Sequence, residues 1–224
     1  LVLSGPKSRE LLAKLTDADL SNEGFRWLSG QEINVAGVQL RALRVSYVGE
    51  LGWELHAPMA DLPALYEALW AAGQDFGLTN IGLYALNAMR MEKGYKAWGT
   101  ELTNELTMVE ADMGRFLALK KDDFVGKAAT LAAPDRFRIV YGEVAADNVD
   151  PRGAEPCMVG DTCIGLTTSG GFGHRTGKSL FFACVPHDHA SPGAEFDIML
   201  QGERHRATVL ATPVYDPDNA KMKA

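Results

Sequence analysis

Apolar side chains recur with helical spacing in the first half of the chain. After Asp61, a suitable capping residue, they fall at i, i+3, i+4, i+7 and i+8 up to Gly73, which predicts an amphipathic helix. A second helix is expected over residues 80–93, with Gly94 as its C-terminal stop. A shorter helix is expected over residues 7–15. The side chains expected to point inward from the second helix are Leu83, Leu86 and Met89.

Between the helix expected over residues 7–15 and the helix that follows Asp61, the pattern is typical of strands. β-Branched and apolar residues predict a hairpin that turns at Ala36-Gly37 and continues as a long strand over residues 38–48. Gly49 and Gly52 then interrupt the run before a strand over residues 53–57. Paired glycines in a strand region indicate a bulge or the close approach of another group to the backbone.

The second half of the chain has a different pattern. No long helical stripe follows residues 127–134, and clusters of glycine, proline and aspartate separate short apolar runs. The strands expected there cover residues 137–144, 163–169, 180–185, 196–200 and 207–211. Such spacing predicts a small all-β barrel or sandwich of about 85 to 90 residues. We therefore expect an α+β chain with one domain over residues 1–130 and a β-barrel domain over residues 134–224.

Composition narrows the classes of function. The 224 residues are 46% hydrophobic and 23% charged, as expected for a folded chain rather than a disordered one. Lys and Arg total 22 against 29 Asp and Glu, and the net charge of −7 argues against an electrostatically driven nucleic-acid partner. No apolar run approaches the roughly 18 residues of a membrane span, so no membrane partner is expected. The first residues lack the basic start of a secretory signal and read as a strand entered midway.

Cysteine and histidine usage gives no sign of a metal site. Cys157, Cys163 and Cys184 form neither an even set nor a CxxC pair, which favours reduced thiols. We expect a cytoplasmic location, or the mitochondrial matrix in a eukaryote. His187 and His189 lie in a proline-containing turn without a visible third ligand, so a solvated turn is the favoured interpretation.

Two catalytic motifs can be set aside. Gly-Lys-Ser at residues 177–179 resembles the end of a phosphate loop, but the glycine required at position 172 is Phe172. A strand rather than a helix is expected next, and we interpret residues 171–179 as a glycine-rich connection between strands. No nucleophile elbow or catalytic cysteine signature is present, so no catalytic residue is assigned.

The most informative residues lie in two stretches, 44–54 and 89–99. Taken alone, they could be a bulged strand and an amphipathic helix with its cap. Tyr, Trp, Glu and Arg are nevertheless dense around the glycines, which is the mixture expected where a flat heteroaromatic ligand is bound.

These stretches carry a family resemblance. SYVGELGWE at residues 46–54, RMEKGYKAWGTELT at 90–103 and DDFVGKAA at 122–129 resemble the aminomethyltransferase family. That family includes the glycine-cleavage T-protein and the C-terminal folate-binding module of dimethylglycine and sarcosine dehydrogenases. KGYKAWG is more similar to the dehydrogenase branch, and the resemblance extends over essentially the whole chain. It implies a folate-binding domain followed by the family's small barrel.

The resemblance implies tetrahydrofolate as the cofactor. Glu54 is the candidate to accept the adjacent N–H donors of the pterin edge, as a carboxylate accepts two from guanidinium. Tyr47, Tyr95 and Trp98 are candidates to cover the ring or the aminobenzoyl group by stacking. Arg90 is expected to orient Glu54 or to meet the anionic folate tail, with a helix-surface ion pair to Glu92 or Glu54 as the alternative.

The sequence also departs from the family pattern. The T-protein branch has a folate-holding arginine near the start of the second helix, where this chain has Tyr84 and Leu86. The family's acid near the reactive folate nitrogen belongs to a segment upstream of residues 1–3, so the N-terminal part of the folate-binding domain is expected to be missing here. No dinucleotide fingerprint is present, and FAD is expected only in a separate N-terminal module.

Three functions remain open on this basis. The chain could be the C-terminal part of a dimethylglycine- or sarcosine-dehydrogenase-like enzyme, inactive alone, whose partner is a flavin module or another amine-oxidising protein. It could belong to a stand-alone aminomethyltransferase or folate-dependent demethylase. It could also be a non-catalytic folate-binding accessory protein of the iron-sulfur assembly type, although residues 121–127 lack the cysteine of that branch.

Overall fold

The computed structural model describes all 224 residues and divides them into two compact units. The first comprises Leu1–Leu86 together with Tyr215–Ala224, and the second comprises Asn87–Val214. The first boundary between the units follows Leu86, within the helix expected over residues 80–93.

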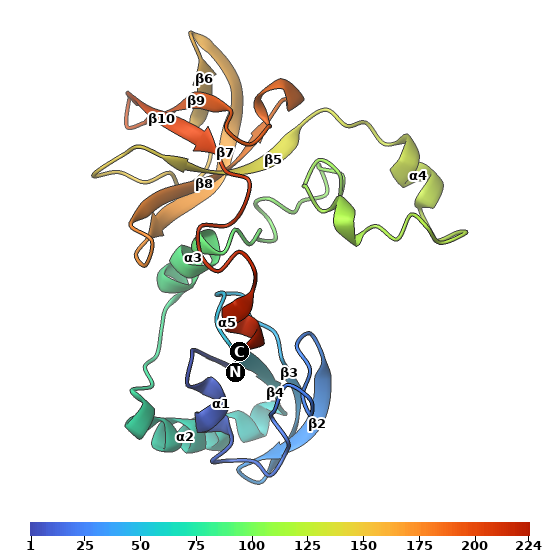
Figure 1. The fold of residues 1–224 in the computed structure, drawn as a ribbon, viewed down its shortest axis with the longest axis vertical. Helices are drawn as coiled ribbons and strands as arrows, with labels where there is room; N and C mark the ends of the chain where they lie inside the picture. Colours follow the sequence, from blue (N-terminus) through green and yellow to red (C-terminus); the bar gives the residue numbers. More distant parts are fainter. The chain divides into compact units, whose positions relative to one another are not determined.

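The first unit contains an antiparallel four-stranded sheet in the order β1-β4-β3-β2 (Figure 1). Its strands are β1 (Val2–Ser4), β2 (Gly30–Val35), β3 (Val38–Leu43) and β4 (Gly52–His56). Its helices are α1 (Ser8–Leu12), α2 (Leu62–Gly73) and the terminal α5 (Ala220–Lys223). Side chains that point to one face of the strands pack with α1 and α2 in a single apolar cluster, which includes Trp53, Leu55, Leu65 and Leu69.

The expected hairpin is present, but its second strand is shorter than predicted. β3 ends at Leu43 rather than at residue 48, and residues 44–51 lie outside the strands. Gly49 has a φ of 77°, a left-handed conformation that an extended strand does not contain. Arg44 is buried, and its guanidinium donates to the carbonyl oxygens of Phe25 at 2.7 Å and Ala224 at 3.2 Å. The residues after β3 therefore tie the C-terminal segment to the first unit.

Helix α3 (Leu83–Glu92) covers most of the second predicted helix, but its buried face is not the predicted one. Leu83 is 82% exposed, and Leu86 and Met89 are only partly buried. The buried residues are instead Arg90, Met91 and Glu92. The apolar pattern could not reveal this orientation because two of the three are charged residues with polar partners, described below.

The second unit contains a closed barrel, which confirms the expected all-β fold of this half (Figure 1). Its strands follow the order β10-β5-β8-β7-β6-β9 around the barrel. Their bounds are β5 (Arg138–Val144), β6 (Pro156–Val159), β7 (Thr162–Gly173), β8 (Lys178–Val185), β9 (Glu195–Leu200) and β10 (Glu203–Val209). Gly142 is required by close packing, since a Cβ there would lie 2.4 Å from Cζ of Phe181. Strand β6 was not predicted from the sequence.

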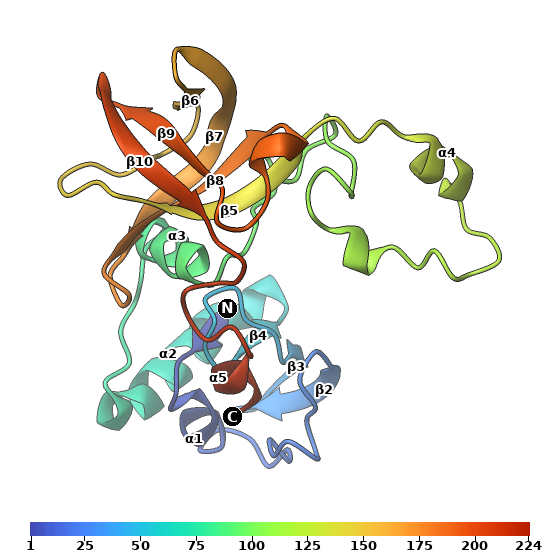
Figure 2. The same ribbon diagram turned by 45° about the horizontal axis from the view of Figure 1, so that its top comes forward.

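The remainder of the second unit has little regular structure. Residues 93–137 include only a short 3-10 turn, Gly114–Phe116, and α4 (Lys127–Ala132). Figure 2 shows that the segment carrying α4 extends away from the barrel. The other 3-10 turns are Met59–Asp61, Gln74–Phe76 and His187–His189.

None of the helices has both the length and the apolar character needed to cross a membrane. The three cysteines are free, and the pKa of the buried Cys157 thiol is raised to about 12 by burial. Acidic, histidine and cysteine side chains do not gather anywhere into a group that could hold a metal ion.

Candidate functional site

Glu54 lies on β4, on the face of the sheet opposite the apolar core. Its neighbours Trp53 and Leu55 are buried, whereas the Glu54 and His56 side chains are 37% and 55% exposed. This alternation follows from the pleat of the strand, which sends successive side chains to opposite faces. His56 Nε2 lies 3.0 Å from Glu54 Oε2. The other carboxylate oxygen of Glu54 has no protein partner, so it can accept further hydrogen bonds.

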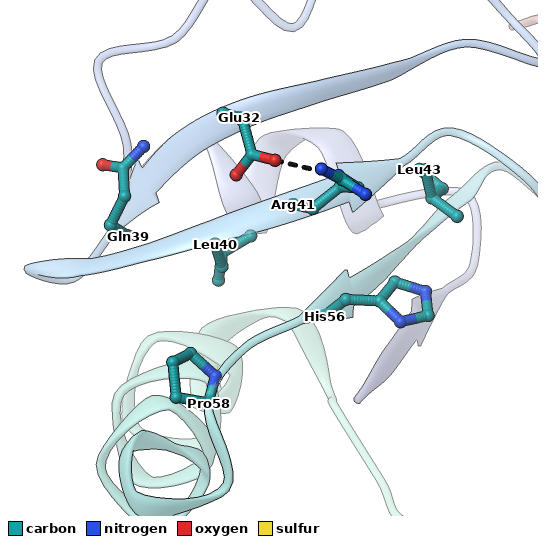
Figure 3. A pocket seen from close by; sticks show the side chains of 7 residues that line it. All are labelled: Glu32, Gln39, Leu40, Arg41, Leu43, His56 and Pro58. Carbon is teal, nitrogen blue, oxygen red and sulfur yellow. Dashed lines mark hydrogen bonds and ion pairs between the residues drawn. The ribbon is translucent and has the colours of Figure 1, made fainter.

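The same face of the sheet is hollowed beside His56. A pocket of about 510 Å³ is lined by Glu32, Gln39, Leu40, Arg41, Leu43, His56 and Pro58 (Figure 3). Figure 3 shows Glu32 of β2 and Arg41 of β3 pointing toward one another, and Arg41 Nε lies 2.8 Å from Glu32 Oε1. Tyr47 lies in the segment between β3 and β4 and is 37% exposed. The first unit therefore presents a carboxylate and an aromatic side chain that both remain accessible.

Arg90 lies in the second unit and is almost completely buried. Its Nε donates to Asn87 Oδ1 at 3.0 Å, and its Nη1 donates to the carbonyl oxygen of Tyr95 at 3.0 Å and to Glu101 Oε2 at 3.3 Å. The alternative of a helix-surface ion pair to Glu92 or Glu54 is therefore wrong, because the partner is Glu101 and the pair is buried. Glu92, one of the partners considered, instead accepts hydrogen bonds from the amides of Arg175 and Thr176.

Tyr95 and Trp98 belong to the loop that follows α3. The helix stops at Gly94, whose φ is 65°, and the Tyr95 amide donates to the Arg90 carbonyl oxygen at 3.0 Å. Tyr95 is partly buried, whereas Trp98 is 87% exposed. A large aromatic ring held at a surface in this way is suited to stacking on a ligand.

Lys96 occupies the same loop and is a further candidate that the sequence did not single out. Its Nζ lies 3.4 Å from Asp112 Oδ2 and 5.5 Å from the centre of the Phe182 ring. Burial lowers the pKa of Lys96, and the neighbouring Asp112 only partly opposes this effect. Burial and the contact with the Phe182 ring thus hold the side chain against the barrel.

The glycine-rich segment at residues 171–179 forms the end of β7, a turn and the start of β8, which confirms that it connects strands. The amides of Arg175 and Thr176 donate to Glu92 Oε1 at 2.9 and 2.8 Å. A Cβ at Gly173 would lie 2.7 Å from Cγ of Glu92. The donors that a phosphate loop would offer to a ligand are therefore used by a carboxylate of the chain itself.

Glu101, whose two carboxylate oxygens both accept hydrogen bonds, could not be identified from the sequence. It is 0% exposed. Burial opposes its ionisation, but hydrogen bonds from Ser169, Thr168 and the Ala97 amide outweigh this effect and hold its pKa below the ordinary value. The only signal in the sequence is a charged residue three positions after Trp98, which by itself is ordinary for a surface position.

The structure thus places the predicted residues in two groups. Tyr47 and Glu54 belong to the first unit, whereas Arg90, Tyr95 and Trp98 belong to the second, where Arg90 contacts the Tyr95 backbone directly.

Comparison with known families accounts for both units. The model of the GCVT N-terminal domain matches residues 1–121, and that of the glycine cleavage T-protein C-terminal barrel domain matches residues 138–216. The second match includes every strand of the closed barrel.

Curated relatives and a solved structure agree with these matches. The chain is 38% identical to mitochondrial dimethylglycine dehydrogenase from Mus musculus over 100% of its own length and 26% of the relative. It is 36% identical to an aminomethyltransferase from Streptomyces coelicolor over 96% of its length and 59% of the relative. Glycine cleavage system aminomethyltransferase T from Bartonella henselae matches with a TM-score of 0.82 at 25% identity, over 95% of this chain and 58% of that one. The chain thus spans only part of each relative, and it belongs to the glycine cleavage T-protein family.

Proposed function

We propose that this chain binds tetrahydrofolate and acts in one-carbon transfer from an N-methyl amine, as the C-terminal part of a dimethylglycine- or sarcosine-dehydrogenase-like enzyme. The observation that carries the proposal is the Glu54 carboxylate. It is accessible on the sheet face, and one of its oxygens has no protein partner. A carboxylate in this state can accept the paired N–H donors of a pterin edge without first breaking an internal ion pair to a lysine or arginine.

The chain's own contribution is binding and orientation. Tetrahydrofolate, when bound, supplies the nucleophilic nitrogen that captures the one-carbon unit. Glu54 accepts hydrogen bonds from the pterin, and Tyr47 covers apolar ligand surface in the first unit. Tyr95 and Trp98 offer aromatic surface in the second unit, whereas Arg90 acts through the loop backbone rather than as a direct ligand. This chain supplies no acid or base in the proposal, and FAD in a separate module would supply the oxidation of the amine.

Calorimetric titration with tetrahydrofolate tests the role of Glu54. E54Q replaces one accepting oxygen with an NH₂ group that faces a pterin donor, so we expect binding about 10- to 100-fold weaker, the range for a lost charge-assisted hydrogen bond. E32Q is the matched control, because Glu32 lies on the same sheet face with its own ion-pair partner. Equal affinities in wild type and E54Q would contradict the proposal.

A stand-alone aminomethyltransferase is the second candidate, favoured by the match to the Bartonella structure over 95% of this chain. The complete reading frame distinguishes the two. A dinucleotide-binding fingerprint upstream of residue 1 would support the dehydrogenase, and a frame of aminomethyltransferase length would support the transferase.

A further inference from the structure

The two oxygens of the Glu101 carboxylate serve different parts of the second unit. Oε2 accepts hydrogen bonds from the Ala97 amide at 2.9 Å, Thr100 Oγ1 at 2.9 Å and Arg90 Nη1 at 3.3 Å. These donors belong to the aromatic loop, which we define as residues 95–102, and to the helix before it. Arg90 also holds the carbonyl oxygen of Tyr95. One carboxylate oxygen and one guanidinium therefore fix the backbone of the loop on both sides of Lys96.

The other oxygen, Oε1, binds the barrel. It accepts from Ser169 Oγ at 2.5 Å and Thr168 Oγ1 at 2.6 Å, both on β7. Successive side chains of a regular strand point to opposite faces, so two consecutive hydroxyls would not normally reach one oxygen atom. The pairing of β7 with β8 shifts register between Thr167 and Ser169. This β-bulge explains how both side chains meet Glu101.

Lys96 also attaches the loop to the barrel, through its contact with the Phe182 ring. Trp98 is 87% exposed, so its ring contributes little packing to the loop that carries it. Within the loop, the Gly99 amide donates to the Leu102 carbonyl oxygen, and the Leu102 amide donates to that of Ala97. These bonds set the local turn, but they do not attach it to the barrel. The Glu101 carboxylate joins this turn to β7.

We propose that Glu101 is a positioning residue for ligand binding, which holds the aromatic loop and its Tyr95 and Trp98 rings in place by tying the loop backbone to the bulge of β7. This inference rests on the proposed function in one respect, namely that tetrahydrofolate is the ligand the loop receives. The attachment of the loop by Glu101 can be measured without any ligand.

E101A, E101Q and E110A in the full 224-residue chain test the proposal. Glu110 is the matched control because it is equally buried in the same unit and bound by Arg136 and Thr107, outside the aromatic loop. In E101A we expect about tenfold weaker tetrahydrofolate binding by calorimetry, because the two aromatic side chains must be ordered at binding. We also expect faster hydrogen exchange of the loop amides, most clearly at Ala97. E110A should lower the melting temperature yet keep both properties.

E101Q provides the conservative rescue. Its amide oxygen can accept from Ala97 and Arg90, and its NH₂ can donate to the hydroxyls of Ser169 and Thr168, which rotate to accept. Exchange and affinity should therefore stay within about threefold of wild type. If E101A does not fold, the double variant T168V/S169A releases only the barrel end of the link, and it should still accelerate loop exchange and weaken binding.

The outcomes separate the two proposals. If the wild-type chain takes up no tetrahydrofolate, the proposed function fails, and exchange of the loop amides then decides the role of Glu101 alone. Loop exchange that is unchanged in E101A, or in T168V/S169A where E101A does not fold, overturns the positioning role. Faster loop exchange with wild-type tetrahydrofolate affinity overturns the connection to binding, as does an affinity loss in E110A equal to that in E101A.

Discussion

Glu101 and Glu110 are both 0% exposed carboxylates of the second unit, but their partners come from different parts of the chain. Glu110 forms a reciprocal cap with Thr107: its Oε2 accepts from the Thr107 amide at 2.9 Å, and its own amide donates to Thr107 Oγ1 at 3.0 Å. Arg136 Nε also donates to Glu110 Oε1 at 2.9 Å, and the Arg136 side chain remains 50% exposed. Glu101 is instead held by hydroxyls 67 and 68 residues away in sequence. Glu110 thus stabilises the turn that begins at Thr107 and binds Arg136, whereas Glu101 connects the aromatic loop to the barrel.

Replacing each carboxylate by alanine is the strongest test of this contrast. E101A leaves Arg90 buried with its charge unpaired and leaves the Ala97 amide and two hydroxyls without their acceptor, so we expect a loss of about 3–5 kcal/mol in the free energy of unfolding. E110A should cost about 1–3 kcal/mol, because the half-exposed Arg136 can be hydrated in place of its lost partner. Urea unfolding at neutral pH measures both. Equal losses would mean that the surface position of Arg136 has no energetic consequence and that the contrast is wrong.

Acid titration tests the hydrogen bonds of the Glu110 carboxylate by a second route. The hydrogen bond from Arg136 holds the pKa of Glu110 at about 2, against an ordinary value of 4.5. As the pH falls through 4.5, the unfolded chain takes up this proton first, so the contribution of Glu110 to stability is present above pH 4.5 and is lost between pH 4.5 and 2. The difference in unfolding free energy between wild type and E110Q should shrink across this window. Parallel curves for the two proteins would contradict the assignment.

The sequence predicts the parts of this molecule that depend on local patterns. Apolar periodicity located α2 and most barrel strands, and the strand predicted over residues 53–57 closely matches β4, which carries Glu54. Strand β6 was missed because it spans only Pro156–Val159 and begins with a proline. The buried face of α3 was wrong because Arg90 and Glu92 are buried through hydrogen bonds that no hydrophobic pattern records.

Glu101 shows most clearly why part of the site could not be predicted. The Thr107-to-Glu110 spacing is itself a recognisable capping signature, so that carboxylate could have been found from the sequence. Nothing near Glu101 in the sequence indicates Thr168 or Ser169. Their approach depends on the register shift between β7 and β8 at Thr167/Ser169. Long-range polar contacts of this kind become visible only in the folded structure.

The smallest expected loss of stability comes from removing one hydroxyl that binds Glu110 and, separately, one that binds Glu101. T107V deletes the oxygen that accepts from the Glu110 amide, and T168V deletes one of the donors to Glu101 Oε1 while Ser169 remains. Each should cost about 1 kcal/mol in urea unfolding, the usual contribution of one capping or buried hydrogen bond. Valine keeps the shape of threonine, so the loss reports the hydroxyl rather than packing.

Hydrogen exchange should nevertheless differ between the two variants. T168V accelerates exchange at the Ala97 amide, 71 positions earlier in the sequence (168 − 97). T107V accelerates exchange only at Glu110 and its immediate neighbours. Faster exchange at Ala97 in both variants would show that the two carboxylates belong to one cooperative network.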